Sequence, residues 1–388
     1  MQKSAATAST KMVQGGSMND DIRADRRTLL QTGAMAGVAM IAGASPGTAQ
    51  TNAEEAALSG GDVAILRFLA AAEIIESDLW VQYNEVGGVQ NNELPGLGGG
   101  GSPAYTAALQ NLDVDMPQYI HDNTEDELTH WSFLNAYLTS KNARPVDLDR
   151  FRTLPSSRAT GAKQIGRLTN LMQLTVDTSW YTRYRNRRHN PDLDSDLKFA
   201  QAVPSLAAGR FPAIPRSDAD LTPAGHIQAI ANTAAFHFCL IEQGGTSLYP
   251  TLAQSVSGAQ VLRVLLSIGP TEACHFQTWH DKAGNAVQPP LAPLTDPTNP
   301  KLVFPNLNAP PFGGEDFQTN LIMPEPCPFL SPHLPAVSIV RPTMKLHGGA
   351  VAAVHGLAAQ GLFIGQTAEF FEFLLELAHG ADAARRDR

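Results

Sequence analysis

Two copies of a short motif, Glu-x-x-His, carry the residues of this chain best suited to bind metal ions. The first runs from Glu127 to His130 and the second from Glu272 to His275. Three residues span a little less than one turn of an α-helix, so the carboxylate and imidazole of each motif project from one face toward a common point. These donors suit iron(II) and manganese(II), and zinc could also occupy them. Each motif is therefore half of a candidate metal centre.

A glutamate upstream of each motif completes a repeated pattern. Glu73 precedes the first motif and Glu242 the second. Aligned on these glutamates, both segments carry an aromatic residue seven positions later, Trp80 or Tyr249, two helical turns away on the same face. Helical bundles that bind two metal ions take one Glu from each of two helices and a Glu-x-x-His from each of the other two. The predicted metal ligands are Glu73, Glu127, His130, Glu242, Glu272 and His275.

Other residues of the same types fit the pattern less well. Glu76 competes with Glu73 on the first helix, because Tyr83 stands seven residues after it. The register match between the two upstream segments favours Glu73. A third Glu-x-x-His, from Glu376 to His379, has no upstream glutamate in the same register and is interpreted as coincidental.

The two upstream glutamates are flanked by runs of apolar residues. A carboxylate among such neighbours is costly unless it is paired or bound to metal. His237 and His280 are expected to be core or supporting histidines rather than ligands. Cys239 and Cys274 are expected to be small buried apolar residues, although their closeness to the ligands leaves a redox role open.

Helical periodicity surrounds every candidate ligand. Helices are expected over residues 61–86, 123–140, 160–186, 224–248, 256–282 and 347–379. Asp62 is expected to cap the first helix, and Asn123 or Thr124 the second. Pro270, two residues before Glu272, is expected to kink the fifth helix or start a new one. Alternating strand patterns are scarce, so the sequence predicts an all-α fold.

Proline content divides the chain into regions. Fourteen of the 27 prolines fall within residues 284–346, which are predicted to be an extended segment. The metal-binding bundle is predicted over residues 61–283, with an inserted helical segment at about 145–222. A C-terminal helix at 347–380 is amphipathic enough to dock on the bundle or on another subunit, so a homo-oligomer is one expectation.

Residues 1–49 are predicted to be a twin-arginine signal peptide. Arg26 and Arg27 precede an apolar stretch rich in glycine and alanine, which ends in small residues. The apolar stretch is too short for a membrane-spanning helix, which needs about 20 residues. We therefore expect a periplasmic or secreted protein that meets the twin-arginine export machinery, which carries folded proteins that often hold a metal already.

The composition of the chain argues against nucleic acid as a general partner and against a disulfide-stabilised fold. The 37 acidic and 28 basic side chains give a net charge of -9, which argues against general nucleic-acid binding. Three cysteines cannot form a disulfide framework. The 43% hydrophobic content supplies enough apolar material for a core.

Four short stretches resemble the ferritin-like domain of bacterial secreted proteins and plant desiccation-related proteins. They are LAAAEIIESDLW, EDELTHWSFL, LIEQGGTSLY and TEACHF. The resemblance implies a ferritin-like four-helix bundle with a two-metal centre, and it carries ligand roles onto the six residues predicted above. Trp80 departs from the family, in which an aromatic hydroxyl is common at that position, and Pro270 is a second departure.

Two functions follow from these expectations. Carboxylates that bridge two iron or manganese ions are the basis of oxidase, oxygenase, ferroxidase and catalase chemistry. The first expectation is therefore an exported di-metal protein with redox activity toward dioxygen or peroxide and a role in stress protection. The alternative is a non-catalytic, desiccation-related envelope protein whose metal site is structural or degenerate, motivated by Trp80, Pro270 and the proline-rich segment.

Overall fold

The fold is mostly helical. The computed structural model describes residues 57–91, 97, 100–183, 199–310, 331, 333–335 and 349–386. Within these residues the strands are β1 (Leu294–Thr295) and β2 (Val303–Phe304), which pair antiparallel. The four long helices are α2 (Gly60–Gly87), α4 (Met116–Ser140), α7 (Ala224–Ala253) and α8 (Ala259–Asn285). The all-α prediction is confirmed, as are the helices expected at 61–86, 224–248 and 256–282.

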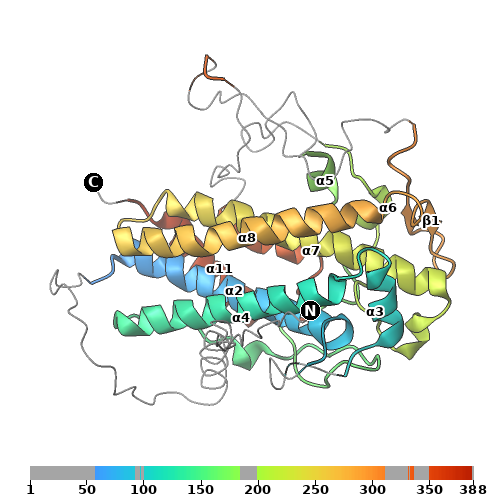
Figure 1. The fold of residues 1–388 in the computed structure, drawn as a ribbon. Coiled ribbons are helices and arrows are strands. Elements are labelled where there is room, and N and C mark those ends of the chain that lie inside the picture. Colours follow the sequence, from blue (N-terminus) through green and yellow to red (C-terminus); the bar gives the residue numbers. More distant parts are fainter. Residues whose placement is uncertain are drawn as a thin grey trace, which may run out of the picture.

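The four long helices pack as two pairs that share one core. Helix α2 packs along α4, and α7 packs along α8. Figure 1 shows the four helices side by side along the length of the molecule, with the short α3 (Pro103–Gln110) at one end. Buried aromatic rings join the pairs: Trp80 of α2 stacks on Trp279 of α8 with ring centroids 5.4 Å apart, and Phe238 of α7 lies 4.7 Å from Trp279.

The start of α2 differs from the sequence prediction. Ser59 is the capping residue, and its hydroxyl oxygen accepts the backbone N–H of Asp62 at 3.0 Å. The Asp62 carboxylate instead accepts the backbone N–H groups of Ser257 and Gly258 at 2.9 and 2.8 Å, just before α8 begins. The prediction that Asp62 caps α2 is therefore wrong, because its side chain ties the start of α2 to the start of α8.

Helix α4 begins seven residues earlier than predicted, at Met116. Pro117 lies in its first turn, a position that suits proline because the first N–H groups of a helix have no partner within it. Asn123 and Thr124, the predicted caps, lie inside the helix and are buried. The cap prediction is wrong, and the correction places the Asn123 side chain in the interior.

Pro270 neither ends nor divides α8, which is continuous from Ala259 to Asn285. Both Pro270 and Leu266, four residues earlier, are exposed. The Leu266 carbonyl, which loses its helical partner to the proline, is therefore on the solvent side, where water can satisfy it. The expectation of a new helix at Pro270 is wrong.

Within the described residues, 145–183 and 199–222, the inserted segment has little helix, and the helix predicted at 160–186 is wrong for its described part. Residues Ser179–Arg183 (α5) are the one part of the predicted helix that is helical within the described residues. Isolated bridges pair Leu154 with Arg167 and Leu174 with Phe211, so the segment is largely irregular. Its other helical turns are η1 (Asp149–Phe151), α6 (Pro204–Ala208) and η2 (Asp218–Leu221).

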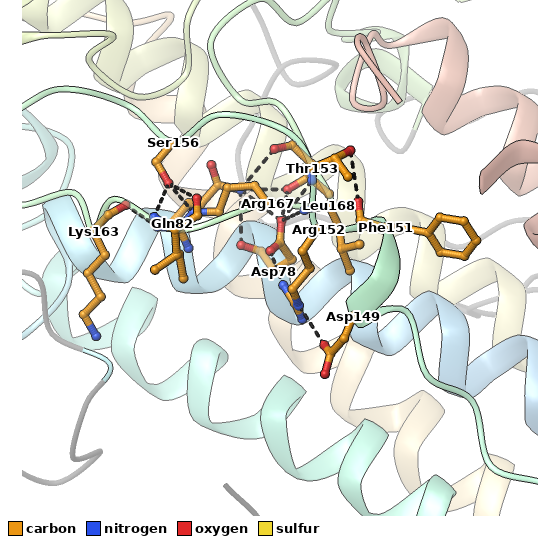
Figure 2. Close-up of polar contacts among 12 residues, drawn as sticks. Asp78, Gln82, Asp149, Phe151, Arg152, Thr153, Ser156, Lys163, Arg167 and Leu168 are labelled. Carbon is orange, nitrogen blue, oxygen red and sulfur yellow. Dashed lines mark hydrogen bonds and ion pairs between the residues drawn. The ribbon is translucent and has the colours of Figure 1, made fainter. Parts of the chain in front are cut away.

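A buried aspartate of α2 holds this irregular segment in place. One oxygen of Asp78 accepts a hydrogen bond from Arg152 at 2.7 Å. Its other oxygen accepts the backbone N–H groups of Leu168 and Thr169 at 3.1 and 2.9 Å. Figure 2 shows Asp78 pointing from α2 into this group of donors. Tertiary hydrogen bonds thus take the backbone donors that a helix would have used, which explains why helical periodicity misled the prediction here.

The single C-terminal helix predicted at 347–379 is two helices, α10 (Ala350–Ala359) and α11 (Ala368–Ala383). Gly361 and Gly365 separate them with φ angles of 85° and 100°, a conformation that favours glycine. Helix α11 packs along α2, so it docks on the bundle, which is one of the two placements predicted.

The predicted signal peptide, residues 1–49, and most of the proline-rich segment after residue 310 lie outside the described residues. Among the helices that the structure does describe, none combines the length and the apolar character needed to span a membrane.

Candidate metal centre

Side chains from all four long helices converge on one point in the core. They form two groups, and within each group one ligand atom per residue lies within 4.8 Å of the others. The first group consists of Glu73, Glu127, His130 and Glu272. The second consists of Glu127, Glu242, Glu272 and His275. Every residue predicted as a ligand is present, and Glu127 and Glu272 belong to both groups. Two carboxylates shared between two sites can bridge a pair of ions.

His130 points its Nδ1 atom into the first group. This atom lies 3.0 Å from Glu127 Oε2, 3.3 Å from Glu272 Oε1 and 3.4 Å from Glu73 Oε2. One nitrogen therefore faces one oxygen from its own helix, one from α2 and one from α8. The spacing of three residues between Glu127 and His130 on α4 produces this orientation, because both side chains leave the same helical face.

His275 occupies the matching place in the second group. Its Nδ1 atom lies 3.2 Å from Glu127 Oε1 and 3.2 Å from Glu242 Oε2. Its other ring nitrogen, Nε2, lies 3.1 Å from Asp126 Oδ2. An ionised carboxylate can only accept a hydrogen bond, so Asp126 favours a proton on Nε2 and leaves Nδ1 free to bind a cation. Metal-binding histidines are commonly held by a carboxylate in this way.

Burial of these charged side chains costs free energy unless a counter-charge is present. Glu127, Glu242 and Glu272 have no exposed area, and Glu73 is 2% exposed. Burial raises the pKa of Glu127 to about 7 and that of Glu272 well above its ordinary value. The four ionised carboxylates carry a charge of about -4, which two divalent cations neutralise when both imidazoles are uncharged.

The two imidazoles respond to the carboxylates around them. Burial alone would lower the pKa of His130, but the charge of Glu73 and a hydrogen bond to the Glu127 carboxylate raise it. The pKa of His275 is raised in the same way by Glu242, Asp126 and Glu127 against the effect of burial. In the metal-free protein, protons on these side chains therefore take the place that cations would fill.

Several oxygens of the cluster lack hydrogen-bond donors. Neither carboxylate oxygen of Glu272 accepts a hydrogen bond, and neither does Glu73 Oε2. A buried polar atom without a partner costs about 1–3 kcal/mol. The residues present therefore fit a metal site: they offer hard oxygen donors that are buried and clustered, and three of these oxygens have no donor from the protein itself.

Asn123 of α4 positions two of the glutamates. Its amide donates to Glu127 Oε1 at 2.9 Å and to Glu242 Oε1 at 3.0 Å. Its carbonyl oxygen accepts the indole N–H of Trp279 at 2.7 Å. The sequence prediction missed this role because it placed Asn123 at the helix start. The spacing of four residues from Glu127 was the signal that could have found it.

The two aromatic residues of the repeated pattern, Trp80 and Tyr249, differ in their hydrogen bonding. The hydroxyl of Tyr249, on α7, donates to Glu73 of α2 rather than to Glu242 of its own helix. Burial raises the pKa of Tyr249 well above its ordinary value, so the hydroxyl keeps its proton and remains a donor. Trp80 packs in the aromatic core, and its buried indole N–H has no hydrogen-bond partner. The sequence repeat thus places a hydroxyl donor on a ligand at one position and an indole in the aromatic core at the other.

Gly245 makes room for Glu272. A Cβ atom at this position would lie 2.4 Å from Glu272 Oε2, closer than real contacts allow. A Cβ atom at the neighbouring Gly244 would meet nothing within 4 Å. The paired glycines in the stretch EQGGTSLY therefore have different roles, and only Gly245 lets the α7 backbone approach a ligand.

Glu76, the rival ligand on α2, belongs to neither group. Burial raises its pKa well above the ordinary value, and the nearby charges of Glu127 and Glu242 add to the effect. Its Oε1 atom is buried and has no hydrogen-bond partner. The structure thus brings Glu73 into the cluster and leaves Glu76 beside it.

The remaining candidates lie outside both groups. His237 is buried, lies 2.8 Å from the Tyr83 hydroxyl through Nδ1, and has a pKa lowered to about 3 by burial. His280 is buried beside Trp180 and Phe276. The third Glu-x-x-His, Glu376 and His379, is exposed on α11. Cys239 is buried as predicted, whereas Cys274 is exposed, so that prediction is wrong.

Comparison with models of protein families, with curated proteins and with solved structures gives no match for this chain.

Proposed function

We propose that this chain is an exported ferritin-like protein whose four long helices bind two iron or manganese ions and use them in redox chemistry toward dioxygen or peroxide. The observation that carries the proposal is the pair of four-ligand groups that share Glu127 and Glu272. The resemblance of the helical stretches around these ligands to the ferritin-like family of secreted and desiccation-related proteins supports it further.

The donor set supports iron or manganese as the cofactor. Four carboxylates and two imidazoles offer mostly hard oxygen donors, which suit iron(II) and manganese(II). Thiolates would favour softer ions, and Cys239, the buried cysteine near the site, belongs to neither ligand group.

When bound, such a pair of ions supplies the electrons for reaction with dioxygen or peroxide. The chain's own residues would set up that reaction. Asn123 holds the shared Glu127 and the terminal Glu242 through its two N–H groups. Tyr249 holds Glu73 through its hydroxyl, and that hydroxyl is a proton donor beside the first group. The buried aromatic side chains of Trp80, Phe238 and Trp279 exclude water from the core between these helices.

The direct test combines metal content with turnover. Protein purified with iron or manganese should hold two ions per chain and consume dioxygen or peroxide. Glu127→Ala should reduce the metal content to less than about one ion per chain and abolish turnover, because it removes a shared ligand. Glu376→Ala is a matched control, because it removes the glutamate of the exposed third Glu-x-x-His. Fewer than about one ion per chain, unchanged by Glu127→Ala, would refute the proposal.

The same experiment decides for or against the alternative function. If metal raises the melting temperature but no dioxygen or peroxide is consumed, the protein is a non-catalytic envelope or desiccation-protection protein with a structural metal site. Trp80 motivates this alternative, because its indole has no oxygen to offer where the related family commonly has an aromatic hydroxyl.

Export is tested separately. Cell fractionation should find the protein in the periplasm or the medium, and replacing Arg26 and Arg27 with lysine should retain it in the cytoplasm. Cytoplasmic location of the unaltered chain would remove this part of the proposal without affecting the metal centre.

A further inference from the structure

A cavity of about 180 Å³ lies where the two C-terminal helices cover the bundle. Helix α10 packs on α7 and α11 packs on α2, and all four contribute to the cavity wall. Most of the wall is apolar and includes Phe68, Leu79, Leu240, Leu248, Leu357 and Leu374. An engineered apolar cavity of about 150 Å³ binds xenon, so this space is large enough for a small apolar gas molecule.

The cavity borders the metal centre in two places. Glu73 of the first ligand group lines it, and so does Tyr249, whose hydroxyl donates to Glu73. Gly245 also lines it, and a Cβ atom at this residue would lie 2.4 Å from Oε2 of Glu272. A molecule in the cavity would therefore lie beside one ligand of the first group and one residue away from a shared ligand.

The polar side chains of the wall offer little to a polar molecule. Gln243 donates to a serine of its own helix, and Tyr249 donates to Glu73. Oε1 of Glu76 and Oε1 of Gln360 have no donor, but both atoms are buried too deeply for a molecule in the cavity to contact them. Hydrogen peroxide in this space would give up hydrogen bonds that it makes in bulk water, whereas dioxygen has none to lose.

The centre meets the surface in a different way between α4 and α8. The side chains of His275 and Asp126, which contact each other, are 11% and 41% exposed. Neither residue is among the described residues that line the cavity. A polar molecule or a cation thus has an approach to the centre that does not cross the apolar space.

We propose that the cavity between α2, α7, α10 and α11 binds dioxygen and delivers it to the Glu73 side of the metal centre. This face of the centre therefore admits dioxygen in preference to peroxide. Delivery to the metal rests on the proposed function, whereas binding of an apolar gas in the cavity does not.

Xenon tests the binding in the full-length, metal-free protein. Crystals under xenon pressure should show an anomalous peak within the cavity. Ala353 of α10 lines the cavity, so Ala353→Phe should fill it and remove the peak. Ala359 of the same helix is exposed and does not line the cavity, so Ala359→Phe is the matched control and should keep the peak. No xenon in the cavity of the unaltered protein, or a peak there in Ala353→Phe, would overturn the proposal.

Single-turnover oxidation of the iron(II)-loaded protein tests the delivery. Two iron(II) ions lose one electron each, and one dioxygen molecule takes up both electrons and two protons from solvent to become hydrogen peroxide. With hydrogen peroxide as the oxidant, the same two electrons and two protons give two water molecules. Stopped-flow absorbance of the ferric product measures the second-order rate constant for each oxidant.

Ala353→Phe should lower the rate constant for dioxygen severalfold and leave that for hydrogen peroxide unchanged. Ala359→Phe should leave both unchanged, and melting curves establish that each variant is folded. If Ala353→Phe does not fold, the smaller change Ala353→Leu takes its place, with a weaker effect in the same direction. An unchanged dioxygen rate in the filled variant, or an equal loss for both oxidants, would contradict delivery through the cavity.

The two experiments separate this inference from the proposed function. If the protein takes up xenon but no metal, the proposed function fails and the delivery of dioxygen fails with it, while the cavity remains a gas-binding site. If the protein holds two ions and oxidises them with dioxygen but takes up no xenon, the proposed function stands and the cavity inference is overturned.

Discussion

Two sets of buried carboxylates on α2 and its neighbours differ in the hydrogen-bond donors that surround them. Asp78, whose side chain is 1% exposed, accepts hydrogen bonds from Arg152, Gln82 and the backbone and hydroxyl of Thr169. Glu272, which has no exposed area, accepts none. Glu73 Oε2, on the same helix as Asp78, also accepts none. The protein supplies donors to both oxygens of Asp78, but it leaves both oxygens of Glu272 and one oxygen of Glu73 without a donor.

This difference separates a structural acid from acids arranged for a ligand. Asp78 fixes the irregular segment after η1, and every donor around it comes from the chain. The glutamates of the centre face one another and two imidazoles, an arrangement that destabilises the folded protein unless a cation or protons neutralise it. The oxygens of the centre that lack donors could hold a cation.

Removal of a shared ligand should have the largest effect. Glu127→Ala should reduce metal content from two ions per chain to less than about one, because Glu127 is the member of both groups that faces both imidazoles. Glu242→Ala, which removes a member of the second group only, should leave one ion. Metal analysis after dialysis measures both, and equal losses in the two variants would contradict the shared role.

Asp78→Ala should destabilise the protein by about 3 kcal/mol, because Arg152 and two backbone N–H groups lose their acceptor. Its metal content should not change. The opposite is expected of Glu272→Gln, which should raise the melting temperature of the metal-free protein and abolish metal binding. Denaturant unfolding of the metal-free proteins measures the pair. If Asp78→Ala stabilised the protein, or Glu272→Gln destabilised it, the distinction between a stabilising Asp78 and a destabilising Glu272 would be contradicted.

Metal affinity should fall as pH falls. Burial raises the pKa of Glu127 to about 7, so this carboxyl is mostly ionised at pH 8 and mostly protonated at pH 6. A cation must displace that proton, so affinity should fall by up to about tenfold per pH unit below pH 7, with steeper loss if more protons leave. Calorimetric titration with manganese(II) at pH 8, 7 and 6, in buffers of different ionisation enthalpy, measures both affinity and proton release. A flat profile without proton release would contradict the prediction.

Alanine substitutions of the paired glycines of α7 should have the smallest effects on metal binding. Gly245→Ala should displace the Glu272 carboxylate and weaken metal binding, because the new Cβ atom would lie 2.4 Å from Oε2. Gly244→Ala meets nothing within 4 Å and should stabilise the helix by about 1 kcal/mol without affecting metal. Melting temperature and manganese affinity of the two variants provide the comparison. If both variants bound metal equally, Gly245 would have no role in admitting Glu272.

The convergence of the candidate ligands could be predicted because it depends on local rules. Helical spacing fixes how Glu127 and His130 project, and a repeat of that spacing on α8 gives the second half. Asn123 and Asp126 were not predicted, although both lie on α4 near the motif, because their roles depend on which other helix packs against that face.

The helix predictions that failed concern regions in which tertiary contacts or glycine turns override the helical periodicity of the sequence. Residues 160–178 have helical periodicity, yet Asp78 takes the backbone donors of Leu168 and Thr169 and an antiparallel bridge takes those of Leu174. Gly361 and Gly365 divide the C-terminal helix at positive φ, and an amphipathic pattern continues across such a turn without a break. Pro117 did mark the true start of α4 and was a usable signal.

Anomalous diffraction from crystals of manganese-loaded protein would test the central claim most directly, because it locates each ion among the side chains. We predict two peaks about 3.5–4 Å apart, with Glu127 and Glu272 between them, Glu73 and His130 on one ion, and Glu242 and His275 on the other. A single peak, or ions bound away from these six side chains, would contradict the account.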